Sequence, residues 1–392
     1  MIALLLAARS PRAFGDGFVA VLLPAYLIAL GHSQLEVGFL STATLLGSAL
    51  ATLAVGRWGH RASKRRLMLA AAVLMVVTGL GFATLSSLWP LLIVGFVGPL
   101  NPTGGDSSVF MPLEHTLIAG AAPASERTSV FARYSFLGAI FGAVGATAAA
   151  IPEWLVGNAG LSLIEALRVM FVAYGVIGFV VWLLYRRLPP PAPADEPRTT
   201  VPLGASRGVV WKLTGLFSVD AFAGGLMMNT LLALWLFQRF DMSLTAAGAF
   251  FFWTGLLGAA SLLAAPLLAK RIGLINTMVF THIPASLCLV AAAFASNVNV
   301  ALGLLLARSA LSQMDVPARS AYVMSVVTPE ERPAAASFTA VPRSLVSAIG
   351  PSLTGAMFAA GAMAAPLVAC GVIKIAYDVA LFTMFRRVGP RN

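Results

Sequence analysis

Ionisable side chains stand inside long apolar stretches of this 392-residue sequence, and they carry most of its chemical information. A charged side chain at the centre of a bilayer costs about 2.5–3.5 kcal/mol even on the gentler insertion scales, so those that are retained usually face a cavity or a partner. The stretches contain Asp16, Asp106, Glu114, His115, Arg133, Asp220, His282, Arg308, Asp315, Arg319, Arg343, Lys374 and Asp378. Such residues can bind a proton, pair with a charged solute or join two helices by an ion pair.

Two carboxylates of one apolar stretch, Asp106 and Glu114, are the first candidates for proton coupling. Coupling needs an acid that binds a cation and a proton in turn. Asp106 follows two glycines, which permit local unwinding of a helix, and Glu114 lies about 12 Å further along by helical rise. The alternative is a fixed ion pair between helices, with Arg133 or Arg343 as the partner.

Asp16 and Asp220 are the other two proton-coupling candidates, and they occupy similar places near the start of two successive sets of helices. Together they could form a ring of negative charge that admits a cation. They could instead pair with Arg12 and Lys212, which precede them closely in the sequence. We favour a functional interpretation, because both sets retain a carboxylate at this place.

Five further residues are candidates for contacting a solute or for gating. Asp315 and Arg319 stand four residues apart, so they can pair on one helical face or form a gate. Arg343 has no acidic neighbour in sequence, which indicates either an anionic solute or the pairing with Asp315 that we favour. Arg133 is the possible partner of a buried acid, and Asn229 could orient a ligand among the surrounding aromatic and methionine side chains.

A second pair with helical spacing is formed by Lys374 and Asp378. Because residues four apart lie on one face of a helix, mutual neutralisation is predicted for them. His282 is interpreted as a hydrogen-bonded core histidine.

The elements that must position these residues are membrane-spanning helices. The sequence is 59% hydrophobic and 10% charged, whereas soluble domains have about 25% charged residues. Apolar stretches of spanning length predict helices near 13–31, 35–56, 66–86, 90–121, 128–151, 164–186, 211–237, 244–269, 274–296, 299–327, 333–360 and 364–385. The predicted fold class is therefore an all-α integral membrane protein with twelve transmembrane helices, which leaves no room for a large soluble catalytic domain.

A segment rich in proline and charge, residues 186–207, divides the predicted helices into six and six. We predict a first six-helix half at 1–187, a linker at 188–210 and a second half at 211–392. Lys and Arg near helix ends concentrate on one side of this arrangement, which places both termini and the linker in the cytoplasm and the chain in the inner (cytoplasmic) membrane. The net charge of +11 then reflects topology and not a nucleic-acid partner.

The two predicted halves also resemble one another. Pro112 and Glu126 in the first half have the same spacing as Pro317 and Glu331 in the second. Duplicated halves around a central path are typical of transporters, although apolar sequences also match one another by chance.

The segment 56–66 resembles the cytoplasmic loop signature of the major facilitator superfamily, with matches at Gly56, Arg61, Lys64 and Arg65. Residues 266–273 are a weaker second copy. The resemblance implies two pseudo-symmetric six-helix halves, a cavity lined by helices 1, 4, 7 and 10, and a monomer. His60 replaces the aspartate of the signature, so it is either a pH-sensitive substitute or a solvated histidine. The drug/proton antiporter patterns of this family are matched only distantly.

The function predicted is secondary active transport of a small solute by alternating access, with protons as the coupling ion and efflux by antiport. Alternatives are a proton-coupled importer or uniporter, and a non-transporting sensor or partner protein with the same fold. Enzymatic motifs such as His-Glu-x-x-His and Gly-x-Ser-x-Gly are absent from the sequence, so no enzyme, cofactor or metal site is expected. The acidic excess along the inner helices favours a neutral or cationic solute.

Overall fold

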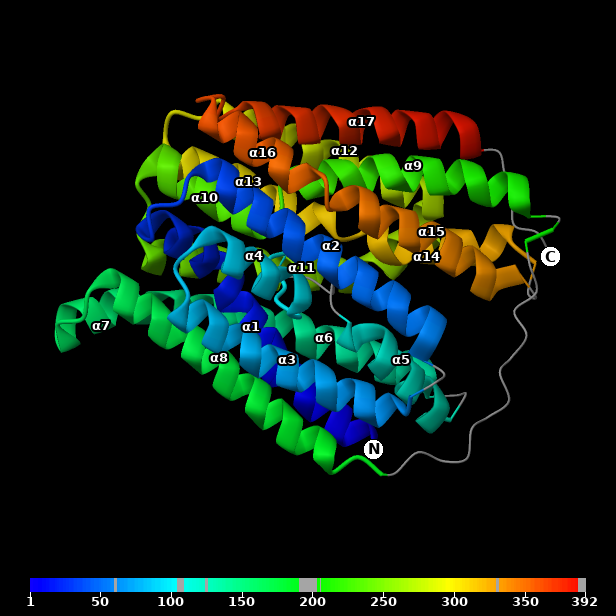
Figure 1. Ribbon diagram of the computed structural model, residues 1–392. Coiled ribbons are helices and arrows are strands. Elements are labelled where there is room, and N and C mark those ends of the chain that lie inside the picture. The colour runs from blue at the N-terminus through cyan, green and yellow to red at the C-terminus, as the bar shows by residue number, and fades with distance from the viewer. Residues whose placement is uncertain are drawn as a thin grey trace. The chain divides into compact units, whose positions relative to one another are not determined.

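The protein is described by a computed structural model over residues 1–59, 62–103, 109–123, 126–189, 203–204, 206–328 and 331–386 (Figure 1). Every regular element in these ranges is a helix, which confirms the all-α prediction. A helix satisfies its own backbone hydrogen bonds, and the hydrocarbon of a bilayer offers no other partner for them.

Nine helical segments of the described chain are long and apolar enough to cross a membrane. They correspond to all the predicted spans except those near 90–121, 299–327 and 333–360. Each of these three is divided into two shorter helices, so the expectation of continuous helices there is wrong. The pairs are α4 (Leu88–Val97) and α5 (Phe110–Ala121), α13 (Val298–Ser312) and α14 (Asp315–Val326), and α15 (Arg332–Ser347) and α16 (Gly350–Ala359).

Local residue chemistry accounts for these interruptions. α4 ends at Gly98, whose backbone is extended, and Pro102 follows shortly after. α16 has Pro351 in its first turn, where the missing N–H of proline removes no helical hydrogen bond. Pro317 lies in the first turn of α14 for the same reason. Proline therefore starts a new helix at two of these three breaks. The helix predicted near 211–237 is also divided, into α9 (Arg207–Leu226) and α10 (Asn229–Phe240), so the expectation of one continuous helix is wrong there as well.

The described helices group into two compact units. The first unit comprises residues 1–195 and 228–253, and the second unit comprises 196–227 and 254–392. The first unit contains α1 (Ile2–Ala29), α2 (Gln34–Trp58), α3 (Lys64–Thr84), α4, α5, α6 (Arg127–Thr147), the short 3-10 helix η2 (Ala148–Ala150), α7 (Ile151–Ala159), α8 (Leu163–Arg186), α10 (Asn229–Phe240) and the start of α11 (Leu244–Ile272).

Close packing of α1 on α6 and of α3 on α8 holds the first unit together (Figure 1). Glycine permits the approach of α1 and α6, because a Cβ atom added at Gly145 would overlap the backbone of Phe14. Small residues at such contacts are the usual means of helix association in membranes. α10 packs on α1, where the Thr230 hydroxyl lies 3.0 Å from the backbone oxygen of Ala20.

The second unit contains α9 (Arg207–Leu226), the rest of α11, α12 (Leu274–Ala293), α13, α14, α15, α16 and α17 (Ala365–Phe385). In it α12 packs against α17, α13 and α14, and α9 packs against α15 and α17 (Figure 1). A buried apolar cluster that includes Phe217, Tyr322 and Tyr377 fills the space between these helices. The packing brings α9, α12, α14 and α17 to a common polar site.

The internal resemblance between the two sets of helices extends to the starts of α6 and α15. Glu126 and Glu331 are the cap residues that immediately precede these helices. The next residue in each case turns its Nε back to a backbone oxygen, Arg127 to Ala122 and Arg332 to Met324, over 3.2 Å in both. The accepting oxygens lie five residues before Arg127 and eight before Arg332, so the two helix starts share a cap residue and the direction of the arginine, but not the same hydrogen bond. The boundaries 1–187, 188–210 and 211–392 stay predictions.

Candidate functional site

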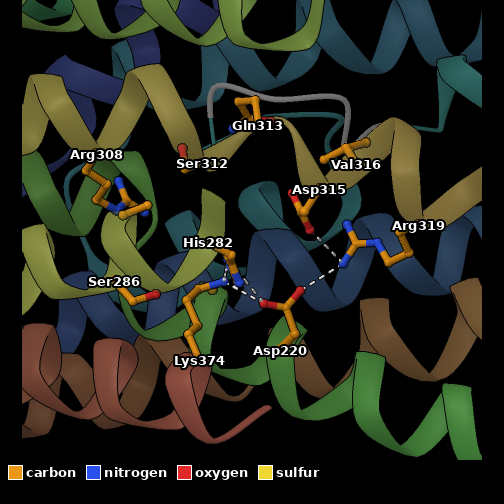
Figure 2. Close-up of a pocket in the computed structure, with 12 residues that line it drawn as sticks. Asp220, His282, Ser286, Arg308, Ser312, Gln313, Asp315, Val316, Arg319 and Lys374 are labelled. Carbon is orange, nitrogen blue, oxygen red and sulfur yellow. Dashed lines mark hydrogen bonds and ion pairs between the residues drawn. The ribbon is translucent and has the colours of Figure 1, made fainter. Parts of the chain in front are cut away.

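Residues of the second unit line a partly open cavity of about 180 Å³ (Figure 2). Its polar lining comes from α9, α12, α13, α14 and α17, and it includes residues on both sides of the break between α13 and α14. The lining residues are Asp220, Gly224, His282, Ala285, Ser286, Arg308, Ser312, Gln313, Asp315, Val316, Arg319 and Lys374. Six of the ionisable residues found in the apolar stretches line this cavity, and a seventh, Asp378, contacts one of them.

Asp220 is the centre of the charged residues in this cavity. Its Oδ1 lies 2.6 Å from Nζ of Lys374, and its Oδ2 lies 2.8 Å from Nη1 of Arg319 (Figure 2). All three side chains are largely buried. One carboxylate therefore contacts two cations from two other helices, so a change in its charge would weaken both contacts.

Arg319 bridges Asp220 to Asp315. Its Nη1 lies 3.4 Å from Oδ2 of Asp315, as the spacing of four residues on one helix predicts. The guanidinium carbon also lies 5.5 Å from the ring centroid of Phe217, a distance at which the ring face attracts a cation. The two candidates of α14 therefore belong to one network with Asp220.

His282 connects Lys374 to Asp378. Its Nδ1 lies 3.0 Å from Oδ2 of Asp378, and its Nε2 lies 3.3 Å from Nζ of Lys374. An ammonium group only donates hydrogen bonds, so Nε2 accepts from Lys374 and Nδ1 donates to Asp378. The predicted mutual pairing of Lys374 and Asp378 is wrong, because each finds a partner on a neighbouring helix instead.

Arg308 lines the cavity from α13 without an acidic partner (Figure 2). Among the described residues it makes no ion pair or hydrogen bond, and its side chain is half-buried. Ser286 on α12 is buried, and its Oγ likewise has no hydrogen-bond partner in the described part of the chain. In the sequence Arg308 is one of several ionisable residues in the apolar stretches, and nothing about its position there distinguishes it from the others.

Glu114 belongs to a separate cluster in the first unit. Its carboxylate pairs with Arg12 and accepts hydrogen bonds from the hydroxyl groups of Tyr134 and Tyr185, the latter over 2.7 Å. Glu114 is fully buried, and the guanidinium carbon of Arg12 lies 4.1 Å from the ring centroid of Phe110. The fixed ion pair considered as an alternative is thus present, but its cation is Arg12 and neither Arg133 nor Arg343.

The other candidates are dispersed. Asp16 on α1 is half-buried, interacts with Arg9 and Arg12, and hydrogen-bonds the side chain of Asn101. Arg133 is exposed on α6, and Asn229 is the first residue of α10. Arg343 is half-buried on α15 without an ion pair to any described residue, so its favoured pairing with Asp315 is wrong, and Asp315 pairs with Arg319 instead. Asp106 lies outside the described residues.

The loop signature is described only in part. Gly56 lies in the last turns of α2, and Lys64 and Arg65 begin α3. Nη2 of Arg65 donates to the backbone oxygen of Arg186 over 2.6 Å, which joins the start of α3 to the end of α8. His60 and Arg61 lie outside the described residues. Within the described ranges, no group of three or more His, Cys, Asp or Glu residues is placed to hold a metal ion.

Glu331 provides a test of pH dependence outside the spanning segments. Hydrogen bonds from the side chain of Ser206 and the backbone of Gly204 hold the pKa of Glu331 below its ordinary value. The carboxylate therefore stabilises the fold above the pKa of the unfolded chain, and this stabilisation is lost as the pH falls through the folded pKa. We expect Glu331→Gln to lower the thermal unfolding midpoint slightly at pH 7 and to reduce its decline as the pH falls below the ordinary glutamate pKa of about 4.3. Equal pH profiles for variant and parent would contradict this.

Comparison with known proteins places this chain among transporters. A family model described as Major Facilitator Superfamily matches residues 5–314. An uncharacterized membrane protein of Saccharomyces cerevisiae is 21% identical over 425 residues, which cover 100% of this chain and 95% of that protein.

Solved structures of transporters have a similar fold. A bacterial homologue of the human lysosomal transporter Spinster, in an inward-facing and occupied conformation, has a TM-score of 0.80 at 15% identity, over 100% of this chain and 98% of that one. The xylose transporter XylE from E. coli, in an inward open conformation, has a TM-score of 0.74 at 13% identity, over 98% and 96%. The nucleoside transporter NupG has a TM-score of 0.74 at 13% identity, over 98% and 99%.

Proposed function

The chain belongs to the major facilitator superfamily of membrane transporters, and we propose that it moves a small solute by alternating access as a secondary active transporter. The family and fold predicted from the loop signature are confirmed, and the protein is a transporter and not an enzyme. The identity of the solute, the direction of transport and the coupling ion are proposed in the paragraphs that follow.

The observation that carries the proposal is the charged network around the cavity of the second unit. Ionisable groups buried in a membrane protein are costly, and they are retained where they face a pathway or a partner. Here Asp220, Arg319 and Lys374 line a cavity instead of lying in a dry contact between helices. A solute that entered the cavity would meet charges that it could rearrange.

Asp220 is the strongest of the four coupling candidates. Protonation of its carboxylate would remove the counter-charge of Lys374 and one of the two acidic partners of Arg319, so proton binding and solute contacts would be linked through one group. Glu114 is enclosed by Arg12 and two tyrosine hydroxyl groups, which suits a structural ion pair better. We therefore propose proton coupling through Asp220 and place Asp16 second.

The proposed direction is efflux by antiport from the cytoplasm, by a monomer with both termini inside the cell. The concentration of basic residues on one predicted side supports this orientation. A proton-coupled importer and a uniporter use the same architecture, and they differ in whether protons move and in which direction.

A flux measurement tests the proposal. Purified protein is reconstituted into liposomes that contain a pH-sensitive dye, and candidate solutes are added under an imposed proton gradient. We expect the gradient to dissipate faster in the presence of a transported solute than in its absence or in protein-free liposomes. Solute flux without proton movement would identify a uniporter or another coupling ion. The absence of both would overturn the proposal in favour of a sensor or partner protein.

A further inference from the structure

We propose that the cavity of the second unit binds the anionic end of its solute, a carboxylate or another compact oxyanion, through Arg308 of α13 with Ser286 of α12 as a second donor (Figure 2). This inference rests on the proposed function, because it names the charge of the solute at the same site.

Among the charged residues around the cavity, Arg308 is the one that lines it without a carboxylate partner in the described part of the chain. Asp220 is matched by Lys374 and Arg319, and Asp315 shares Arg319. Asp378 is held by His282. Within the described ranges no carboxylate remains for Arg308, and an arginine is always protonated in proteins. Its positive charge therefore has no protein counter-charge in the part of the chain that the structure describes.

The surroundings of Arg308 do not replace that counter-charge. The titratable groups that interact with it are the thiols of Cys288 and Cys370. Arg308 stands in the last turns of α13, which ends at Ser312, so the negative end of the helix dipole favours a cation there. The helix dipole therefore stabilises the positive charge of Arg308, but it does not occupy the guanidinium N–H groups, which stay available to a ligand.

Ser286 adds an independent observation from another helix. Its side chain is 2% exposed, and its Oγ has no hydrogen-bond partner among the described residues although it lines the cavity. A buried hydroxyl without a partner is costly. A ligand oxygen in the cavity would accept a hydrogen bond from this hydroxyl as well as from Arg308.

The wider charge balance points to the same class of solute. Arg343 on α15 interacts electrostatically with Arg319, Asp220 and Asp315, and it has no ion pair with a described residue. The cations of this region, Arg308, Arg319, Arg343 and Lys374, thus outnumber its three carboxylates. The acidic excess along the inner helices had predicted a neutral or cationic solute, because the cations that pair with those acids lie on other helices and cannot be assigned from the sequence. A cation would reach Asp220 only by displacing Lys374 or Arg319.

The size of the cavity limits what it can hold. A volume of about 180 Å³ is smaller than the roughly 300–1,000 Å³ of drug-sized ligand sites. The cavity therefore suits a small organic acid or inorganic oxyanion, or the charged end of a longer solute. A guanidinium binds both kinds of oxyanion with the same planar set of donors.

Ligand-dependent thermal unfolding of the purified full-length protein in detergent micelles tests the site. The probes are acetate, lactate, benzoate and inorganic phosphate, and the matched neutral probes are acetamide, lactamide and benzamide, at constant ionic strength set with sodium chloride. We expect at least one anion to raise the unfolding midpoint with saturation, and its amide to have no effect. Carboxylates and phosphate in separate samples distinguish an organic acid from an inorganic oxyanion.

Three variants connect the effect to the cavity. Arg308→Gln is expected to weaken the apparent affinity about 10- to 100-fold, because it removes a charged hydrogen-bond donor. Ser286→Ala should weaken it less, and it keeps the test valid if the arginine variant does not fold. Arg239→Gln removes an exposed arginine of the first unit that does not line the cavity, and it should bind as the parent does.

The outcomes separate this inference from the proposed function. No saturable shift with any anion, or a shift unchanged in both Arg308→Gln and Ser286→Ala, would overturn the anion site. Coupled flux of a neutral or cationic solute that Arg308→Gln leaves intact would also overturn it and would leave the transporter proposal standing. Anion binding that depends on Arg308, without flux in liposomes, would support the site and contradict the transport function.

Discussion

Asp220→Asn is expected to reduce solute-driven proton movement in proteoliposomes to the level of protein-free liposomes. Asparagine has nearly the shape of aspartate but cannot bind and release a proton, and its amide does not balance the charges of Lys374 and Arg319. Arg319 retains Asp315 as a partner at 3.4 Å, whereas Lys374 loses the carboxylate that it contacts. The variant should therefore lose coupling and also some stability.

A second substitution separates these two losses. Removing one member of a buried ion pair costs about 3–5 kcal/mol, largely because the remaining charge is left buried alone. Adding Lys374→Met to Asp220→Asn removes that charge, so the double variant should regain much of its thermal unfolding midpoint while proton coupling stays lost. The matched control is Asp241→Asn, which changes an exposed aspartate at a positive φ of 49° that asparagine also adopts readily.

Two results would contradict the role of Asp220. If Asp220→Asn retained solute-driven proton movement at the rate of the parent, Asp220 could not be the coupling group, and Asp16 would be the next carboxylate to test. If Asp241→Asn abolished coupling equally, the loss would reflect the substitution of any aspartate and not the cavity.

Glu114→Gln is expected to have the largest effect on stability in the first unit. The carboxylate is fully buried, pairs with Arg12 and accepts from Tyr134 and Tyr185. Glutamine removes the ion-pair partner of Arg12, at a cost of about 3–5 kcal/mol by analogy with other broken buried pairs. The expected result is a clear fall in the thermal unfolding midpoint measured in micelles, and a lower yield of folded protein.

The control for Glu114 is a glutamate whose replacement should be nearly neutral. Glu36 forms a capping box with Ser33 at the start of α2 and is half-exposed. Glutamine serves equally in a capping box, so Glu36→Gln should leave the midpoint close to that of the parent. The double variant Arg12→Met with Glu114→Gln should recover stability relative to Glu114→Gln alone. A midpoint for Glu114→Gln equal to that of Glu36→Gln would contradict a structural role for the ion pair.

Pairs of charged residues on one helix could be predicted from the sequence only in part. Asp315 and Arg319 were predicted to be close, and they are, because four residues of helix bring two side chains to one face. The same argument failed for Lys374 and Asp378. Spacing along one helix shows which side chains are able to meet, but here Lys374 and Asp378 each have a partner on a neighbouring helix instead.

Partners far apart in the chain were not predictable from spacing. Arg12 and Glu114 are 102 residues apart, and Lys374 and Asp220 are 154 apart. Which of many buried charges pair depends on how each helix is rotated about its axis and where it crosses its neighbours. Several acids and bases in one sequence permit many combinations, and close packing selects one.

The sequence by itself determined the all-α membrane class, the approximate positions of nine spanning segments and the family of this protein. Apolar stretches of spanning length are folded as helices because hydrocarbon leaves the backbone no other hydrogen-bond partner, and Gly56, Lys64 and Arg65 stand in the loop signature of the superfamily. Only the tertiary structure decided which charges are satisfied. Burial makes each unpaired charge costly, so the unpaired positive charge of Arg308 indicates a ligand. That the charge is unpaired can be recognised only when the partners of the other charges around the cavity are known.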